Sequence, residues 1–336
     1  SFNYSAYDDA ISVSARFLTE TQEAAMALLK GSLVAPSFTD VALNRVRAQV
    51  LAGLKSDSKD PDSIVSQRFD ALAFGDHPYG SRAEGTIDSV SALTQDQIRA
   101  AHLGTLVRDR VYASAVGDIT AEQLTTLLDS LLSDLPQSGR PMPSKVAYKL
   151  DGGTTVVDFD TPQSVAIFAQ RGIERDHPDF FAAYLVNQIL GGGSFESRLM
   201  EEVREKRGLT YGVYSYLLPK DFSHLYIGRV ASANDRIAEA VAVIRAEWTR
   251  MADSGVTQDE LRRAKTYLTG SYPLRFDGNG PIANIMVGMQ MQGLPVAYIN
   301  DRNDKINAVT LQDANRVARQ LLDPAGLHFV VGGRPE

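Results

Sequence analysis

The spacing of hydrophobic positions changes along the chain between the interval of a helix and that of a strand. Apolar residues follow Thr39 at helical spacing as far as Leu54, and a similar helix is predicted after Thr257. Each threonine stands where a helix N-cap is expected. The second segment begins 218 residues after the first and matches it at threonine, leucine and arginine. This match suggests an internal repeat, which the neighbouring blocks can test.

Three more pairs of blocks recur in the same order at nearly the same spacing. They are residues 11–17 with 227–232, 90–94 with 306–310, and 111–117 with 327–333. The blocks of the last pair are strand-like and end at glycine, so each predicts a closing strand. Four blocks in order at a nearly constant spacing indicate two related units. Each unit is predicted to run from strands through helices to a last strand.

Strands and helices in this order predict an α+β fold of two tandem homologous units. Each unit would be a mostly antiparallel sheet with helices packed on one face, and a clam-like cleft would lie between the units. Residues 1–134 form the first predicted unit and residues 146–336 the second. Residues 135–145 between them contain three prolines and are predicted to form an extended linker and hinge. The repeat spacing places the start of the first unit roughly 70 residues ahead of Ser1, so we expect its front to be missing.

Composition narrows the possible function classes only a little. The 336 residues, 44% of them hydrophobic and 22% charged, are enough for two ordinary globular domains. A net charge of −7 argues against a nucleic-acid groove, which needs lysine and arginine to replace phosphate counterions. The absence of cysteine excludes disulfides, thiol nucleophiles and cysteine-based zinc sites. No run of about 18 apolar residues exists, so no membrane span is predicted.

The most informative stretch is a pair of predicted helices separated by three glycines. Asp176 is predicted to cap the first helix, which continues to Leu190 and ends at the glycines at 191–193. Ser194 would cap the second helix, which stops at Gly208. The glycines carry no lysine and no serine or threonine in the pattern of a phosphate loop, so we interpret them as a helix end that allows close backbone approach.

Arg204 and Tyr211 are the two candidate functional side chains of this stretch. Arg204 lies on the last predicted helical turn before Gly208, and Tyr211 is predicted to begin the strand that follows. If both face one cleft, a guanidinium fork and a phenol donate hydrogen bonds there to a peptide carbonyl or an oxyanion. The plainer interpretation pairs Arg204 with Glu201 or another surface acid and makes Tyr211 an ordinary strand aromatic.

The run from Arg204 to Tyr211 resembles the arginine/tyrosine motif of the pitrilysin or insulinase family of zinc metallopeptidases, which includes the mitochondrial processing peptidase. The preceding stretch at 191–199 is similar to the one that leads into that motif in the family. Parts of the first unit also resemble the family, namely residues 36–38, residues 77–80 and Thr86. The resemblance covers essentially the whole chain, and the family's tandem duplication agrees with the repeat.

The resemblance implies that the zinc site of the family is incomplete in this chain. The family binds zinc through a helical H-x-x-E-H motif and a downstream glutamate, with an assisting glutamate seven residues earlier. No two of the five histidines have the required spacing, and the motif would lie in the missing front. The third ligand would fall at Gly53 and the assisting glutamate at Val46, and neither side chain has a donor atom. We therefore expect no metal site and no cofactor in this chain.

The resemblance also implies a function shared between two chains. A heterodimeric partner bearing H-x-x-E-H would hold Zn²⁺, and this chain would be the zinc-lacking, substrate-binding subunit, inactive alone. Arg204 and Tyr211 would bind peptide and stabilise the oxyanion in the partner's active site. Gly192, Gly193 and Ser194 would help to hold the peptide in an extended form. The expected reaction of the pair is therefore peptide hydrolysis.

Several alternatives remain open at this point. The chain is also compatible with a homodimer, with a non-enzymatic homologue of the core subunits of respiratory complexes, and with a peptide-binding module that has no catalytic partner. It is compatible as well with an active zinc endopeptidase whose H-x-x-E-H lies in the missing front. Related bacterial pairs imply a periplasmic or cell-envelope location, with the cytoplasm as the alternative. The implied substrates are peptides, and no nucleic-acid partner is expected.

Overall fold

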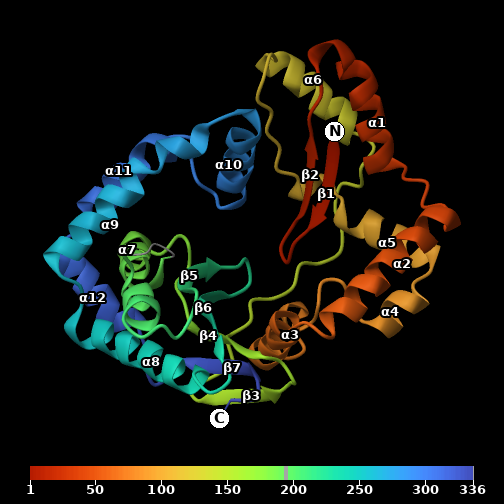
Figure 1. The fold of residues 1–336 in the computed structure, drawn as a ribbon. Coiled ribbons are helices and arrows are strands. Elements are labelled where there is room, and N and C mark those ends of the chain that lie inside the picture. The colour runs from red at the N-terminus through yellow and green to blue at the C-terminus, as the bar shows by residue number, and fades with distance from the viewer. Residues whose placement is uncertain (193–195, 336) are drawn as a thin grey trace. The chain divides into compact units, whose positions relative to one another are not determined.

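The computed structural model describes residues 1–192 and 196–335, which form an α+β fold with two separate sheets (Figure 1). The predicted fold class is confirmed. Contacts divide the chain into two compact units, and each unit is assembled from three segments. Unit 1 comprises Ser1–Lys55, Arg82–Met142 and Leu274–Val296, and unit 2 comprises Ser56–Ser81, Pro143–Pro273 and Ala297–Glu336. One change of unit falls inside the predicted linker, whereas residues 56–81 and 274–296 each pack with the unit to which the sequence repeat does not assign them.

Unit 1 is mainly helical and contains one antiparallel hairpin. Its strands are β1 (Phe2–Ala6) and β2 (Ile11–Ala15), and its helices are α1 (Gln22–Val34), α2 (Asp40–Asp57), α4 (Ile87–Ala92), α5 (Gln95–Thr105), α6 (Ala121–Leu132) and α10 (Asn279–Met291). Short 3-10 turns span Thr19–Thr21 and Arg108–Arg110. Leu29, Leu33 and Leu131 form a small hydrophobic cluster that joins α1 to α6. The described part of unit 1 therefore has little core of its own.

The strand predicted at residues 111–117 does not form. This segment has no strand pairing, whereas the matching block at 327–333 contains a strand. The segment runs beside α10 instead, and the Ser114 hydroxyl donates to the Ala283 carbonyl at 2.8 Å. A strand needs a neighbouring strand to satisfy its backbone groups, and no described strand pairs with this segment. The prediction was wrong because a strand-like pattern cannot supply its own partner.

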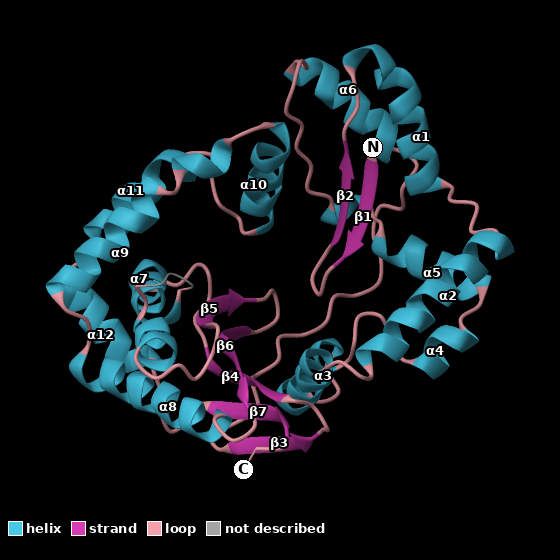
Figure 2. Cartoon of the chain, in the orientation of Figure 1, coloured by secondary structure: helices cyan, strands magenta, loops and turns pink. Residues whose placement is uncertain are grey.

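Unit 2 is built on a five-stranded sheet with the order β3-β7-β4-β6-β5 (Figure 2). Its strands are β3 (Thr154–Asp158), β4 (Gln163–Arg171), β5 (Val213–Pro219), β6 (His224–Ala233) and β7 (His328–Gly333). Its helices are α3 (Pro61–Phe74), α7 (Phe180–Gly191), α8 (Ile237–Ser254), α9 (Gln258–Gly270), α11 (Tyr298–Ala308) and α12 (Leu311–Leu321), with a π-helical turn η4 (Met200–Glu205) and 3-10 turns at Pro78–Gly80 and Pro273–Phe276. Among the described strands of the sheet only β3 and β7 pair in parallel, so the sheet is mostly antiparallel. No helix in the described chain is long and apolar enough to cross a lipid bilayer.

Helices cover both faces of this sheet, so the prediction that they pack on one face was wrong, because α3 joins this sheet from earlier in the chain. On one face Phe168 of β4 packs with Trp248 of α8 in a large core that also contains residues of α7, α9 and α12 (Figure 1). On the other face α3 places Val65 and Phe69 in a second cluster with Ile167 of β4. Successive residues of a strand point to opposite faces, so β4 is buried along nearly its whole length. The sheet of unit 2 is therefore a rigid platform for the segments attached to its edge.

Threonine caps fix the starts of many of the helices. A capping box, in which a threonine and the residue three positions later exchange hydrogen bonds, begins α4, α5, α6, α9 and α12. At the start of α9, Thr257 Oγ1 accepts from the Glu260 N–H at 3.2 Å and the Glu260 carboxylate accepts from the Thr257 N–H at 2.7 Å. Thr39 Oγ1 accepts from the Ala42 N–H at 3.3 Å at the start of α2. The two caps predicted from the repeat are thus confirmed.

Candidate functional site

The helix that leads into the candidate site begins later than the sequence predicts. The predicted cap was Asp176, whereas α7 begins at Phe180 and its N-cap residue is Asp179. The Arg316 guanidinium donates two hydrogen bonds to the Asp179 carboxylate, at 2.6 and 2.8 Å, and these bonds lower the pKa of Asp179. The N-cap residue of α7 is therefore engaged by α12, far along the chain, and local capping rules could not reveal that contact.

Arg204 lies on the wide turn of π-helix η4. The Lys206 N–H donates to the Glu201 carbonyl at 2.9 Å, five residues back, as this helix type requires. Val203 is buried beneath the turn, whereas 32% of the Arg204 side chain is exposed. Single π-helical turns are rare and occur often at functional sites. The turn therefore presents Arg204 at the surface while anchoring its neighbour in the core.

Gly208 ends this turn, as the sequence predicted. Its φ of 61° lies in the left-handed region, which a residue without a Cβ adopts without strain. The Gly208 N–H donates to the Arg204 carbonyl at 2.8 Å, and the Leu209 N–H donates to the Val203 carbonyl at 2.9 Å. Leu209 is buried, and the Ser232 hydroxyl of β6 donates to its carbonyl. The turn between Arg204 and the next strand is therefore tied down on both sides.

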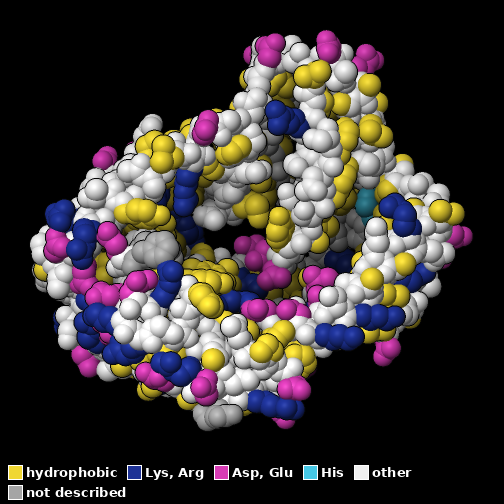
Figure 3. Space-filling view, viewed as in Figure 1, with side chains coloured by type: hydrophobic (Ala, Val, Ile, Leu, Met, Phe, Trp, Pro, Cys, Tyr) yellow, Lys and Arg dark blue, Asp and Glu magenta, His cyan; other side chains and the backbone are white. Residues whose placement is uncertain are grey.

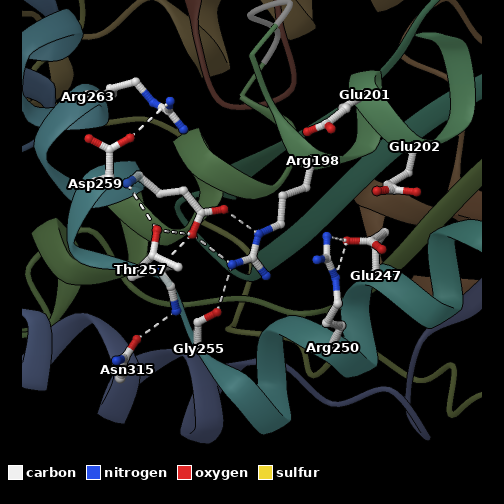
Figure 4. Close-up of polar contacts among 12 residues, drawn as sticks. Arg198, Glu201, Glu202, Glu247, Arg250, Gly255, Thr257, Asp259, Arg263 and Asn315 are labelled. Carbon is white, nitrogen blue, oxygen red and sulfur yellow. Dashed lines mark hydrogen bonds and ion pairs between the residues drawn. The ribbon is translucent and has the colours of Figure 1, made fainter. Parts of the chain in front are cut away.

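A buried ion pair holds the start of this segment against the body of unit 2 (Figure 4). Arg198 donates from Nε and Nη2 to the two carboxylate oxygens of Glu260, at 2.7 and 2.9 Å, and from Nη2 to the Gly255 carbonyl at 2.9 Å. Burial alone would raise the pKa of Glu260, but the Arg198 guanidinium and the Thr257 N–H outweigh burial and lower that pKa to about 2. The ionised carboxylate therefore links the start of α9 to the chain just before the π-helical turn.

A second group of ion pairs lies within the turn itself. Glu202 accepts from Lys206 Nζ and from Arg207 Nη1, each at 2.7 Å, and these hydrogen bonds lower its pKa. Glu201 lies 2.9 Å from the same Lys206. Glu201 is therefore engaged by a lysine, and Arg204 Nε lies 3.6 Å from a carboxylate oxygen of Glu205, another surface acid, as the plainer interpretation allowed. An exposed pair at that distance contributes little to stability.

Tyr211 lies ahead of the strand that it was predicted to begin. The Thr210 hydroxyl bonds the backbone of Gly212, accepting from its N–H at 3.0 Å, and this local turn delays the start of β5 to Val213. The Tyr211 side chain is 88% exposed, so it adds almost nothing to the core of unit 2. Its ring and hydroxyl are open to a ligand, at the opposite end of the Gly208 turn from Arg204.

The structure describes only one of the three small residues assigned to peptide binding. Gly192 follows α7 so closely that a Cβ there would lie 2.6 Å from the Gln188 Cα, which explains glycine at this position. Gly191 is equally constrained, because its Cβ would lie 2.4 Å from the Ser215 hydroxyl of β5. Gly193 and Ser194 lie outside the described residues. The described glycines thus allow the end of α7 to approach β5.

The two positions that would complete a zinc site both lie on α2 in unit 1. The Val46 side chain is 47% exposed, and a Cβ added at Gly53 would meet no atom within 4 Å. These residues offer space but no nitrogen, oxygen or sulfur, so they do not fit Zn²⁺. Within the described chain, no three histidine, aspartate or glutamate side chains are placed to hold a metal ion.

Sequence reasoning missed the residues that hold the site in place. Arg198 stands inside the stretch that resembles the peptidase family, and Glu260 completes a threonine capping box, so each carried a local signal. Nothing in the sequence joined the two, because they are 62 positions apart. The two tyrosines of β5, Tyr214 and Tyr216, were predicted only as members of a strand.

Comparisons with known proteins find similar sequences over most of the chain. A family model described as "Peptidase M16 inactive domain" matches residues 92–268. The chain is 27% identical to the "Non-peptidase homolog YmxG" of Helicobacter pylori, over 98% of this chain and 77% of that protein. It is 30% identical to an "Uncharacterized zinc protease" of Mycobacterium tuberculosis, over 82% of this chain but only 64% of that protein. The relatives are thus longer than this chain.

Solved structures share the fold over the whole chain. The crystal structure of a "peptidase M16 inactive domain" from Pseudomonas fluorescens has a TM-score of 0.89 and 28% identity, and the match covers 100% of this chain and 81% of that one. A chain of "Complex III2 from Candida albicans" has a TM-score of 0.81 at 16% identity, over 99% of this chain and 82% of that one. The second match shows a common fold alone.

Proposed function

The chain belongs to the family of peptidase M16 inactive domains, and from this we propose that it is the zinc-lacking, substrate-binding subunit of a heterodimeric peptidase. Two observations carry the proposal: Arg204 and Tyr211 lie on a segment that the core of unit 2 holds in place, and the two positions on α2 that would complete a zinc site are Val46 and Gly53. Tyr211 is exposed and adds almost nothing to the core, so its ring and hydroxyl can act on a ligand. A catalytic zinc site would have to come from another chain.

The chemistry proposed for Arg204 and Tyr211 is hydrogen-bond donation to the substrate. The Arg204 guanidinium donates to the carbonyl at the scissile bond, where it fixes the register of the bound chain and shares in stabilising the oxyanion. The Tyr211 hydroxyl donates to the carbonyl oxygen as negative charge develops on it, which stabilises the transition state more than the ground state. Gly192, Gly193 and Ser194 border the path of the extended peptide. The partner would provide the zinc ion and the activated water.

The segment from Arg198 to Tyr211 is held rigidly by unit 2, and this rigidity supports the roles proposed for Arg204 and Tyr211. A donor contributes to catalysis only if it is already in place when charge develops. The Arg198–Glu260 pair and the buried Leu209 fix the segment from two directions, and the Gly208 turn has backbone hydrogen bonds on both sides. The Arg204 and Tyr211 backbones are therefore set by unit 2, while their side chains remain accessible. We also propose a periplasmic or cell-envelope location, on the resemblance to bacterial pairs of this kind alone.

Peptidase activity of the chain alone and mixed with an H-x-x-E-H partner, with zinc present, tests the proposal. We expect activity only in the mixture. Arg204→Ala and Tyr211→Phe should each lower kcat/KM by about a hundredfold, which is the usual cost of one oxyanion donor. The matched controls, Arg262→Ala and Tyr267→Phe, alter exposed side chains of α9 and should leave kcat/KM unchanged.

Other outcomes select the alternatives. Zinc-dependent activity of the chain alone would overturn the proposal and indicate an active endopeptidase. A stable complex whose activity is unaffected by Arg204→Ala would favour a structural subunit, such as those that share the fold in respiratory complexes. A homodimer that needs no second protein for activity would exclude the heterodimer. Peptide binding without hydrolysis in every mixture would indicate a binding module.

A further inference from the structure

Residues 210–212 join two buried anchors of unit 2, and Tyr211 is the middle residue of this connection. Leu209, just before it, is buried, and the Ser232 hydroxyl of β6 donates to its carbonyl. Val213, just after it, is also buried and begins β5. The chain is therefore fixed on both sides of Tyr211, and the groups that order Tyr211 itself lie within the three connecting residues.

The Thr210 hydroxyl bonds to both backbone groups of Gly212. It accepts from the Gly212 N–H at 3.0 Å and donates to the Gly212 carbonyl at 2.9 Å. These two bonds span Tyr211, so they restrict the rotation of the backbone on both sides of it. Tyr211 itself makes no hydrogen bond to another described residue. One hydroxyl group therefore orders the backbone that carries the Tyr211 side chain.

Packing against the rest of unit 2 does not replace those two bonds. The Tyr211 side chain is exposed, and a Cβ added at Gly212 would meet no atom within 4 Å. Hydrophobic side chains gather at the surface over β5, the strand that follows, and such side chains offer no hydrogen bonds to the residues before it (Figure 3). A glycine beside an exposed side chain has the largest choice of backbone conformations, so local bonds decide which one is populated.

We infer that Thr210 is a positioning residue for Tyr211. Its hydroxyl holds the backbone so that the Tyr211 hydroxyl is already in place when negative charge develops on the substrate. Thr210 does not itself touch the substrate. This inference rests on the proposed function and adds a residue to the same site. A donor fixed in advance needs no reordering in the transition state, so loss of the Thr210 hydroxyl should lower kcat and leave KM nearly unchanged.

Hydrogen exchange of the Gly212 N–H, followed by NMR on this chain alone, tests the ordering step without any partner. Thr210→Val removes the hydroxyl but keeps the branched shape, and Thr210→Ser keeps the hydroxyl. Exchange should be about tenfold faster in Thr210→Val, because the amide loses the bond that protects it, and close to wild type in Thr210→Ser. Thr266→Val is the matched control: it removes a threonine bond to a backbone carbonyl on α9 and should leave this exchange unchanged.

Cleavage of an internally quenched peptide by the chain mixed with its H-x-x-E-H partner tests the positioning step. Thr210→Val should lower kcat about tenfold and change KM less than about twofold, and Thr210→Ser should restore kcat. Adding Thr210→Val to Tyr211→Phe should lower kcat no further, because the hydroxyl that Thr210 positions is already gone. General damage to unit 2 would instead add its own loss to that of Tyr211→Phe.

The outcomes separate this inference from the proposed function. An active wild-type mixture in which Thr210→Val keeps its full kcat would overturn the inference and leave the proposed function in place. Unchanged exchange of the Gly212 N–H in Thr210→Val, a loss that serine does not restore, or an additive loss in the double variant would also overturn the inference alone. A wild-type mixture without activity would overturn both.

Discussion

The two units of this chain differ in how completely their sheets are covered. In unit 2, helices pack on both faces of a five-stranded sheet, and β4 is buried from Ser164 through Gln170. In the described part of unit 1, the sheet is a single hairpin and the hydrophobic cluster is centred on three leucines. A two-stranded hairpin is marginal by itself, because its backbone and side chains have few partners. Related sequence blocks therefore yield a rigid platform in one unit and a sparser arrangement in the other.

The repeated helices α2 and α9 show this contrast in detail. α9 buries Leu261, Ala264 and Leu268, and its capping glutamate is also an ion-pair partner of Arg198. α2 is longer but buries only Leu54 among its described residues. The same threonine start thus serves a packed helix in unit 2 and a largely exposed one in unit 1. Packing, more than the local signal, decides how much each helix contributes.

The largest expected effect comes from α3, which belongs to unit 2 by packing although unit 1 segments flank it in the chain. Phe69→Ala should destabilise unit 2 by about 3 to 5 kcal/mol, because Phe69 is 2% exposed and its removal leaves a cavity. Hydrogen exchange by mass spectrometry should show faster exchange in β4 and β7. Exchange in α1 should not change.

Leu29→Ala is the matched change in unit 1. It should cost about 2 kcal/mol, less than Phe69→Ala, since the surrounding cluster is smaller and can relax. Its effect on exchange should be confined to α1 and α6. Equal acceleration throughout the chain in both variants would mean that the units do not unfold separately.

An intermediate effect is expected from acid on the Arg198–Glu260 pair. The pKa of Glu260 falls from an ordinary 4.5 to about 2 in the folded chain. Its stabilisation is therefore fully present above about pH 5 and is lost as the pH falls toward 2, by up to about 3 kcal/mol. Denaturant unfolding of unit 2 between pH 6 and pH 3 should follow this course. This loss of stability reflects protonation of the Glu260 carboxylate, which then no longer pairs as an anion with the buried Arg198 guanidinium.

Glu260→Gln should flatten that pH dependence, because the amide cannot titrate, and should lower stability at pH 6. Glu122 of α6 provides the comparison from unit 1. The backbone at its own helix start lowers the pKa of Glu122, but this carboxylate is fully exposed, so Glu122→Gln should leave the acid profile unchanged. An unaltered profile in Glu260→Gln would show that the buried pair does not govern acid unfolding.

The smallest expected effect sharpens the comparison of α9 with α2. Thr257→Ala removes a reciprocal capping box and should cost about 1 kcal/mol, whereas Thr39→Ala removes one 3.3 Å hydrogen bond and should cost about 0.5 kcal/mol. Serine at either position should restore the loss. Equal shifts of the unfolding midpoint in both alanine variants would show that the reciprocal bond adds nothing.

Much of the candidate site could be predicted from local sequence. Gly208 ends the turn after Arg204 because only a residue without a Cβ adopts its conformation freely. The start of α7 was predicted wrongly, at Asp176: its N-cap residue is Asp179, whose partner Arg316 lies on α12, far along the chain. The π-helical turn under Arg204 could not be predicted either. Its backbone hydrogen bond spans five residues, from Lys206 to Glu201, and the helical spacing of apolar residues gave no signal for that wider turn.

The sequence by itself determined the α+β class, the threonine caps, the glycine turn and the resemblance to a zinc-peptidase family whose ligands are missing at Val46 and Gly53. Each of these depends on residues a few positions apart, whose effect on the backbone is local. Tertiary structure alone decided that residues 111–117 form no strand, that α3 packs in unit 2, and that Arg198 meets Glu260. Those outcomes depend on which partners come within a few ångströms, and distance along the chain does not specify that.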